Sequence, residues 1–153
     1  SAIAGPAVAG VPVTHRDHAS SVSFVTGHED PTKAESAVDW EALAATGGTI
    51  VVLMGVGRLP DYTAALRSAG LDADTPVALV ERATWPDQQV ATGTLASIVE
   101  VRDREGIEPP AITVIGDVAG ERERVVEFLR GYGGDAPDGD ASDDETEEEG
   151  DDT

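Results

Sequence analysis

The chain has 153 residues, of which 40% are hydrophobic and 4% aromatic, and its formal net charge is −20. This length suits one domain, and such a composition is typical of an α/β core built from valine, alanine, leucine and isoleucine. The absence of cysteine excludes disulfides and thiolate chemistry. No stretch approaches the ~18 apolar residues of a membrane span. The chain lacks the clustered basic residues that bind phosphates, which disfavours nucleic-acid binding.

The first half of the chain predicts two strands, each followed by a helix. Val22–Thr26 is typical of a strand closed by Gly27, and a polar loop over 28–38 follows it. Asp39 is suited to cap a short helix that stops at Gly47. Thr49–Met54 is a continuous apolar run, which indicates a buried strand. Pro60 then starts a helix that ends at Gly70, with one apolar stripe formed by Tyr62, Ala65, Leu66 and Ala69.

The second half continues the alternation of strands and helices. Pro76–Val80 predicts a buried strand, and Gln88–Ala91 a further strand that turns at Gly93. Thr94 is suited to cap a helix whose one side carries Leu95, Ile98, Val99 and Arg102. Ala111–Ile115 predicts another strand. The last predicted helix is Glu121–Arg130, with its inward side formed by Val125, Phe128 and Leu129.

This order of elements predicts an α/β layered domain over residues 1–132, with a sheet of about five strands flanked by helices. The order in which the strands pair does not follow from the pattern. Residues 133–153 have no hydrophobic periodicity and hold eleven acidic residues without a base, so we predict a disordered, solvating tail there.

The acidic surface extends beyond this tail, because residues 1–134 hold 19 acids against 10 bases, only one of which is lysine (Lys33). A low-lysine, acid-coated surface indicates adaptation to high salt, since ~1 M salt shortens the Debye length to about 3 Å. A merely acidic mesophilic protein is the alternative. Ser1–Pro12 lacks the basic start and long apolar run of a secretory signal, and we expect a cytoplasmic protein.

Residue patterns for metal binding and for hydrolysis are weak. His15, His18 and His28 match no spacing typical of metal ligands, so no metal is predicted and loop histidines with local hydrogen bonds are the favoured interpretation. A serine hydrolase is disfavoured, because no Gly-x-Ser-x-Gly elbow occurs.

Two strand ends are stronger candidates for a ligand site. Met54 and Gly55 follow one buried strand and Glu81–Thr84 follow another, and open α/β sheets bind ligands at the carboxyl ends of strands. Gly55 would let a ligand approach the backbone closely. Two plain strand-to-helix turns are the alternative interpretation. If the ends are adjacent, they line one cleft.

The segments Thr14–Arg16 and Thr26–His28, followed in order by others along the chain, resemble uroporphyrinogen-III C-methyltransferases, within the tetrapyrrole methylases. The similarity covers about residues 1–130, and its most specific elements are Thr14–Arg16 and Thr26–His28. The remaining matching segments are Ala9–Val13, Val38–Leu43, Leu53–Val56, Thr75–Thr84, Pro86–Gln88, Thr92–Leu95, Pro109–Ala111 and Gly116–Val118.

The resemblance implies that this chain corresponds to the C-terminal half of a two-domain enzyme that holds S-adenosylmethionine (SAM) between its domains. It implies transfer of two methyl groups to carbons of uroporphyrinogen III, giving precorrin-2 for sirohaem and cobalamin synthesis. The family's glycine-rich opening motif and its catalytic acid and lysine have no counterpart here. Catalytic residues are therefore expected in an N-terminal half, and the chain alone is expected to be inactive.

The resemblance also implies candidate contacts. Ser1, Ala2 and Met54 match cofactor-contacting segments, and Ala83 matches a position, often glycine, that touches SAM through its backbone; Gly55 joins them from the strand-end argument. Arg16, Arg58 and Arg82 are candidates for the eight carboxylates of the substrate, with surface ion pairing as the alternative. Two departures from the family are Gln89, often arginine, and Trp85, usually smaller.

Relatives in this family are typically homodimers, and a homodimer is expected here. Two other hypotheses stay open. The chain could be a non-catalytic binding or dimerisation module that reuses the half-fold. It could also belong to a methylase that acts on a later corrinoid intermediate or on a substrate that is not a tetrapyrrole, against which the Thr14–Arg16 element argues.

Overall fold

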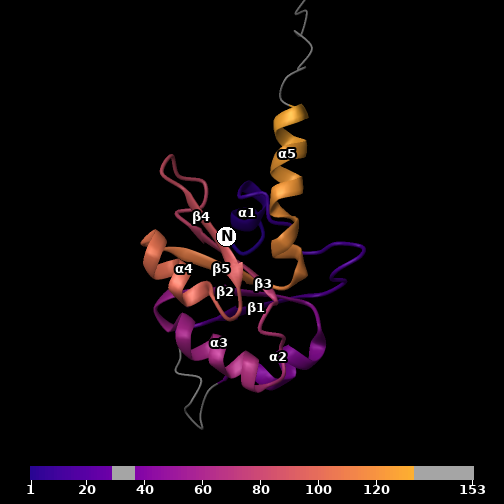
Figure 1. The fold of residues 1–153 in the computed structure, drawn as a ribbon, viewed down its shortest axis with the longest axis vertical. Helices are drawn as coiled ribbons and strands as arrows, with labels where there is room; N and C mark the ends of the chain where they lie inside the picture. The colour runs from indigo at the N-terminus through magenta and orange to yellow at the C-terminus, as the bar shows by residue number, and fades with distance from the viewer. Residues whose placement is uncertain (29–36, 133–153) are drawn as a thin grey trace, which may run out of the picture.

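A computed structural model describes residues 1–28 and 37–132 of the chain. The predicted acidic tail at 133–153 and most of the predicted loop at 28–38 lie outside the described residues. Within them, a five-stranded mixed sheet carries helices on both faces (Figure 1). The predicted α/β layered fold with about five flanked strands is therefore confirmed.

The strand order of the sheet is β1-β2-β5-β3-β4. β1 (Val22–Thr26) pairs in parallel with β2 (Thr49–Leu53), whereas all other neighbours are antiparallel. The three remaining strands are β5 (Ala111–Ile115), β3 (Pro76–Glu81) and β4 (Gln89–Thr94). β5 is buried along its whole length between β2 and β3, which fits its apolar sequence.

Three helices cover one face of the sheet: α2 (Trp40–Thr46), α3 (Leu59–Ser68) and α4 (Ile98–Glu105). Asp39 caps α2 as predicted, because its carboxylate accepts the Ala42 N–H at 2.9 Å, and Gly47 ends the helix with φ 70°. The core on this face is apolar and includes Tyr62, Leu66, Leu79, Leu95 and Ile98, all fully buried.

The opposite face is covered by the N-terminal segment and by a 3-10 turn, η2 (Asp117–Glu121). A second buried cluster there joins Val11 and Val118 to the sheet residues Val51, Val80 and Val114. The N-terminal segment includes α1 (Ala4–Val8), a five-residue helix that the sequence patterns did not predict. Such a short helix carries too few turns to produce hydrophobic periodicity.

Three predictions of local structure were wrong. β4 does not turn at Gly93 but continues through it to Thr94. The glycine serves packing instead: a Cβ there would lie 3.2 Å from Val101 Cγ2, so the missing side chain lets α4 pack closely on the strand. Thr94 does not cap α4 and is the last residue of β4; Ser97 precedes the helix.

The third concerns α5 (Arg122–Tyr132), which has no buried residue. Phe128 and Leu129, predicted to face inward, are exposed. In Figure 1, α5 extends away from the sheet rather than lying along it, so its distal turns have no core to pack against. No helix among residues 1–28 and 37–132 is long and apolar enough to cross a membrane.

Candidate functional site

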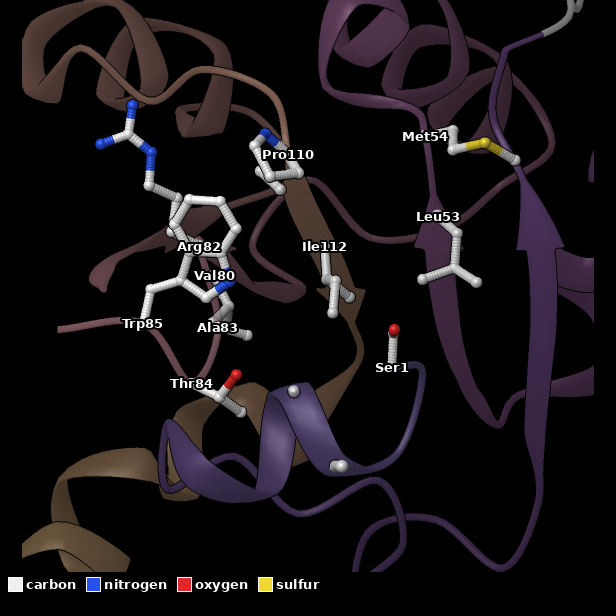
Figure 2. A pocket seen from close by; sticks show the side chains of 13 residues that line it. Ser1, Leu53, Met54, Val80, Arg82, Ala83, Thr84, Trp85, Pro110 and Ile112 are labelled. Atoms are coloured by element: carbon white, nitrogen blue, oxygen red, sulfur yellow. The ribbon is translucent and has the colours of Figure 1, made fainter. Parts of the chain in front are cut away.

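The two strand ends that are candidates for a ligand site, those of β2 and β3, lie at one edge of the sheet. β2 and β3 are both antiparallel to β5, which lies between them, so β2 and β3 run in the same direction. Their carboxyl ends therefore flank the start of β5. A cavity of about 500 Å³ opens at this edge (Figure 2), lined by Ser1, Ala4, Gly5, Leu53, Met54, Val80, Arg82, Ala83, Thr84, Trp85, Pro110, Ala111 and Ile112.

The walls of the pocket come from different segments. Figure 2 shows Leu53 and Met54, from the end of β2, across the cavity from the loop after β3, with Pro110 and Ile112 of the β5 segment between them. Ser1 lies on the N-terminal side, just before α1. The lining is mainly apolar, which is typical of small-molecule sites.

Backbone strain is concentrated at this pocket. Three non-glycine residues among those described have positive φ, namely Met54 (54°), Arg82 (46°) and Thr84 (75°), and all three line the cavity. A left-handed conformation is unfavourable for side chains with a Cβ, most of all for β-branched threonine. Such strain persists where the surrounding structure enforces it, and it is frequent at ligand sites.

The loop after β3 is held by its own hydrogen bonds. The Arg82 N–H donates to the Pro110 carbonyl at 2.9 Å, and the Trp85 N–H donates to the Arg82 carbonyl at 2.9 Å. The Gln88 N–H donates to the Trp85 carbonyl at 3.1 Å, and the Thr84 N–H donates to Gln88 Oε1 at 2.9 Å. These bonds fix the backbone that carries Arg82, Thr84 and Trp85.

Ion pairs hold the Arg82 side chain on the same loop. Its guanidinium donates to Asp87 Oδ2, and its Nε lies 3.5 Å from Glu81 Oε1. The hydrogen bond to Asp87 and the charge of that carboxylate raise the pKa of Arg82 above its ordinary value. Glu81 is buried, and its Oε2 accepts the Glu108 N–H at 3.0 Å. Arg82 is therefore a fixed, permanent cation at the pocket.

Ala83, between the two strained residues of this loop, keeps its backbone polar groups free. No hydrogen bond within residues 1–28 and 37–132 uses its N–H or its carbonyl, although the residue is only partly exposed. A free donor and acceptor beside apolar walls are suited to the polar edge of a ligand.

The sequence-predicted site residues fall into two groups. Ser1, Met54, Ala83 and Arg82 come together around the pocket, although they are far apart in the chain. Ala2 and Gly55 do not line it. The role suggested for Gly55 has a packing explanation instead, because a Cβ there would lie 2.6 Å from Val52 Cγ1 and 3.1 Å from Tyr62 Cε1.

The other two arginine candidates lie away from the pocket. Arg58 is the last residue of η1 (Val56–Arg58), the short 3-10 turn after β2, and it pairs with Asp61 at 3.1 Å. Arg16 is exposed at the tip of a small hairpin closed by the His15–Ala19 bridge, and it has no ion pair within the described part of the chain.

Two of the three histidines, His15 and His18, lie side by side. The rings of His15 and His18 are 4.8 Å apart, and His18 Nε2 is 2.9 Å from Glu121 Oε1. Among residues 1–28 and 37–132, no group of three His, Asp or Glu side chains could hold a metal ion. Here the hydrogen bond of His18 ties the hairpin to the residue just before α5.

Sequence reasoning missed several lining residues, notably Trp85, Pro110 and Ile112. Trp85 is about 57% exposed although it is large and apolar, and the sequence marked it only as a departure from the family. Pro110 and Ile112 reach the pocket because β5 inserts between β2 and β3, and no sequence signal specified that insertion.

Comparison with known proteins identifies the family. Residues 1–99 match the Tetrapyrrole (Corrin/Porphyrin) Methylases. The chain belongs to this family. A protein of Methanosarcina barkeri described as an S-adenosyl-L-methionine-dependent uroporphyrinogen III methyltransferase is 53% identical over 134 residues, covering 84% of this chain and 52% of that protein. A Synechocystis uroporphyrinogen-III C-methyltransferase is 44% identical over 84% of this chain and 51% of its own length.

Solved structures give the same assignment. A uroporphyrin-III-C-methyltransferase from Thermus thermophilus matches with a TM-score of 0.64 and 29% identity, over 82% of this chain and 51% of that one. The enzyme complexed with S-adenosyl homocysteine matches with a TM-score of 0.58 and 32% identity, over 72% of this chain and 48% of the other. The tetrapyrrole methylase chain described here thus spans about half the length of the curated relatives it matches.

Proposed function

We propose that this chain forms one wall of a SAM-dependent methyltransferase that converts uroporphyrinogen III to precorrin-2 in sirohaem and cobalamin synthesis. The observation that carries the proposal is the strained pocket at the ends of β2 and β3, in a chain 53% identical to a protein described as a methyltransferase of this kind. Ser1, Met54 and Ala83, three residues that the resemblance predicted as cofactor contacts, line this pocket.

The chemistry of the lining fits the methyl donor. The apolar side chains of Leu53, Val80 and Ile112 are suited to a nucleoside and to the carbons beside a sulfonium. The free backbone groups of Ala83 are suited to the polar edge of an adenine. In this proposal Ser1 and Met54 contact the donor from the N-terminal segment and from the end of β2.

The methyl transfer itself needs little covalent help from the protein. An electron-rich pyrrole carbon attacks the sulfonium methyl in line, a carbon–carbon bond forms, and the carbon–sulfur bond breaks to release S-adenosylhomocysteine. Positioning and a favourable field for the changing charge dominate such a step. This chain supplies the donor wall, and catalytic acid–base groups are proposed to come from outside it.

The substrate carries many carboxylates, and Arg82 is the best placed of the three arginine candidates. Its guanidinium is held at the pocket by Asp87 and Glu81, so a substrate carboxylate would share it with these acids. Arg16 and Arg58 are not at the pocket lining. Substrate contacts by them would require the tetrapyrrole to extend beyond the cavity.

A labelling experiment tests the proposal. The protein as its gene encodes it is incubated with uroporphyrinogen III and SAM labelled in the methyl group, and two labelled methyl groups per tetrapyrrole are expected. Label on a later corrinoid substrate instead would favour a different methylase of the family. One such protein, a cobalt precorrin-4 methyltransferase, has a structure that matches this chain with a TM-score of 0.67 at 26% identity.

The 153 residues alone provide the complementary test. Because one wall of the site is not a complete active site, this chain with SAM and uroporphyrinogen III is expected to give no precorrin-2. Substantial turnover by the chain alone would contradict the proposal that the catalytic groups lie elsewhere.

We further propose three properties of the protein that the resemblance and the composition support: a homodimer, a cytoplasmic location and function at high salt. The net charge of −20 with a single lysine supports the last of these. Sedimentation velocity in low and high salt tests the dimer and the salt requirement together. A monomer at every salt concentration would contradict the dimer.

A further inference from the structure

Trp85 is an exposed aromatic side chain on a fixed loop at the pocket, and the proposed function has not used it. The chain has two tryptophans. Trp40 is buried, and its ring stacks on Tyr62 with centroids 5.3 Å apart. Trp85 is about 57% exposed and has no ring partner among the described residues. A large indole left in water at a cavity wall is a feature that binding can exploit.

The backbone around Trp85 is unusually well fixed for an exposed residue. Its N–H donates to the Arg82 carbonyl at 2.9 Å, and its carbonyl accepts the Gln88 N–H at 3.1 Å, so it ends one turn and begins the next. The ion pair between Arg82 and Asp87 spans the same loop. Little conformational freedom of the backbone would be lost on binding, and preorganised aromatic side chains bind at low entropic cost.

The position of the indole selects which part of a ligand it meets. Figure 2 shows Trp85 on the same wall as Val80, Ala83 and Arg82, across the cavity from Met54. Ala83, two residues before it, has the free backbone N–H and carbonyl that suit the polar edge of an adenine. If the edge of a purine forms hydrogen bonds with the Ala83 backbone, its flat face remains free to stack on the Trp85 side chain of the same loop.

We propose that Trp85 is a positioning residue that stacks on the adenine ring of the methyl donor. This inference rests on the proposed function, because it assumes that SAM binds in this pocket. The tetrapyrrole is the less suitable partner, since uroporphyrinogen has saturated bridging carbons and offers no single flat face. Arg82 on the same wall presents a cation to the donor carboxylate or to a substrate carboxylate.

Binding of S-adenosylhomocysteine by titration calorimetry tests the stack in the protein as its gene encodes it. Base–aromatic stacking contributes enough per base that Trp85→Ala is expected to weaken binding at least about fivefold. Trp85→Phe keeps a ring and is expected to bind within about threefold of the wild type. The affinity for 5′-methylthioadenosine, which keeps the adenine, should fall by the same factor in Trp85→Ala.

Tryptophan fluorescence adds a readout that a merely structural role would not move. The wild type is expected to change its emission on binding S-adenosylhomocysteine, and Trp85→Phe should lose that change while it still binds in calorimetry. Phe24→Ala is the matched control, because Phe24 is an exposed aromatic residue of β1 outside this pocket, and its affinity should be unchanged. Circular dichroism checks that each variant is folded.

The possible outcomes separate the two proposals. Binding by Trp85→Ala with wild-type affinity would overturn the stack and leave the proposed function standing. So would an increased KM for uroporphyrinogen III with an unchanged KM for SAM, since the indole would then contact the tetrapyrrole. Failure of the wild-type protein to bind S-adenosylhomocysteine or SAM would overturn the proposed function, and the stack with it.

Discussion

Exposed apolar side chains occur both at the pocket edge and along α5, but the backbone that carries them differs between the two regions. Met54 and Trp85 at the pocket edge stand on strained or hydrogen-bonded backbone that closes a concave site. Phe128, Leu129 and Tyr132 stand on a regular helix without a buried residue. Ordinary helical geometry costs nothing extra, whereas left-handed backbone does. The difference indicates that the fold tolerates unfavourable backbone conformations to shape the pocket, whereas α5 is an ordinary helix with exposed apolar side chains.

The attachments of the two regions differ in the same way. α5 is anchored near its start, where Arg122 Nε donates to the Ala9 carbonyl at 3.0 Å, the half-buried Val125 and Val126 pack against Gly10, and Glu121 pairs with His18 and Arg124. Next to Met54, where β1 and β2 end, Gly27 and Gly55 pack so closely that a Cβ on Gly27 would lie 2.8 Å from Gly55 Cα. The following substitutions compare these regions.

A pair of glycine substitutions is expected to give the largest contrast. Gly27→Ala should destabilise the protein by about 1–3 kcal/mol, because its Cβ meets both Gly55 Cα and the stiff, buried Val52 side chain. Gly131→Ala on α5 has nothing within 4 Å of its Cβ and should stabilise the helix by up to ~1 kcal/mol. Urea unfolding measures both. Equal effects would remove the distinction between a packed edge and a free helix.

Relieving the backbone strain at the pocket should increase the free energy of unfolding. Thr84 has φ 75°, and asparagine tolerates this conformation better than a β-branched residue. Thr84→Asn is therefore expected to stabilise the protein by about 1 kcal/mol. Thr14→Asn, at an exposed position without positive φ, is the matched control and should change little. A loss of stability in Thr84→Asn would show that the threonine side chain, and not strain, decides this position.

The anchor of α5 should depend on pH. Burial opposes ionisation of Glu121, but its hydrogen bond from His18 and the nearby charge of Arg124 outweigh this and lower its pKa. A carboxylate with a lowered folded pKa stabilises above its unfolded pKa of about 4.3, and that contribution is lost as the pH falls through the folded pKa. The difference in melting temperature between wild type and Glu121→Gln should therefore be present at neutral pH and vanish in strong acid. A difference independent of pH would contradict this assignment.

The smallest effect is expected on the exposed face of α5. Phe128→Ser should change the free energy of unfolding by no more than ~0.5 kcal/mol, because the side chain is exposed and its one aromatic neighbour within the described residues is Tyr132 of the same helix, at 5.9 Å between ring centroids. Unfolding at low protein concentration measures this without any contribution from association. A loss above ~1 kcal/mol would mean that the chain itself covers this face.

Sequence patterns alone determined the strands and the main helices. The three central strands β2, β5 and β3 are short, mainly apolar runs, and such runs are typical of strands buried on both faces. Asp39 and Gly47 bound α2 through local hydrogen bonding and local backbone geometry. Met54 and Ala83 were likewise identifiable, because they follow strands directly and sit in segments similar to a known family.

Tertiary structure decided what those patterns left open. Insertion of β5 between β2 and β3 set the distance between the two strand ends and brought Pro110 and Ile112 into the pocket. It also decided that Gly55 serves packing and that Phe128 and Leu129 of α5 stay exposed. Hydrophobic periodicity records that a face is apolar, but only the arrangement of the other elements determines whether anything covers it.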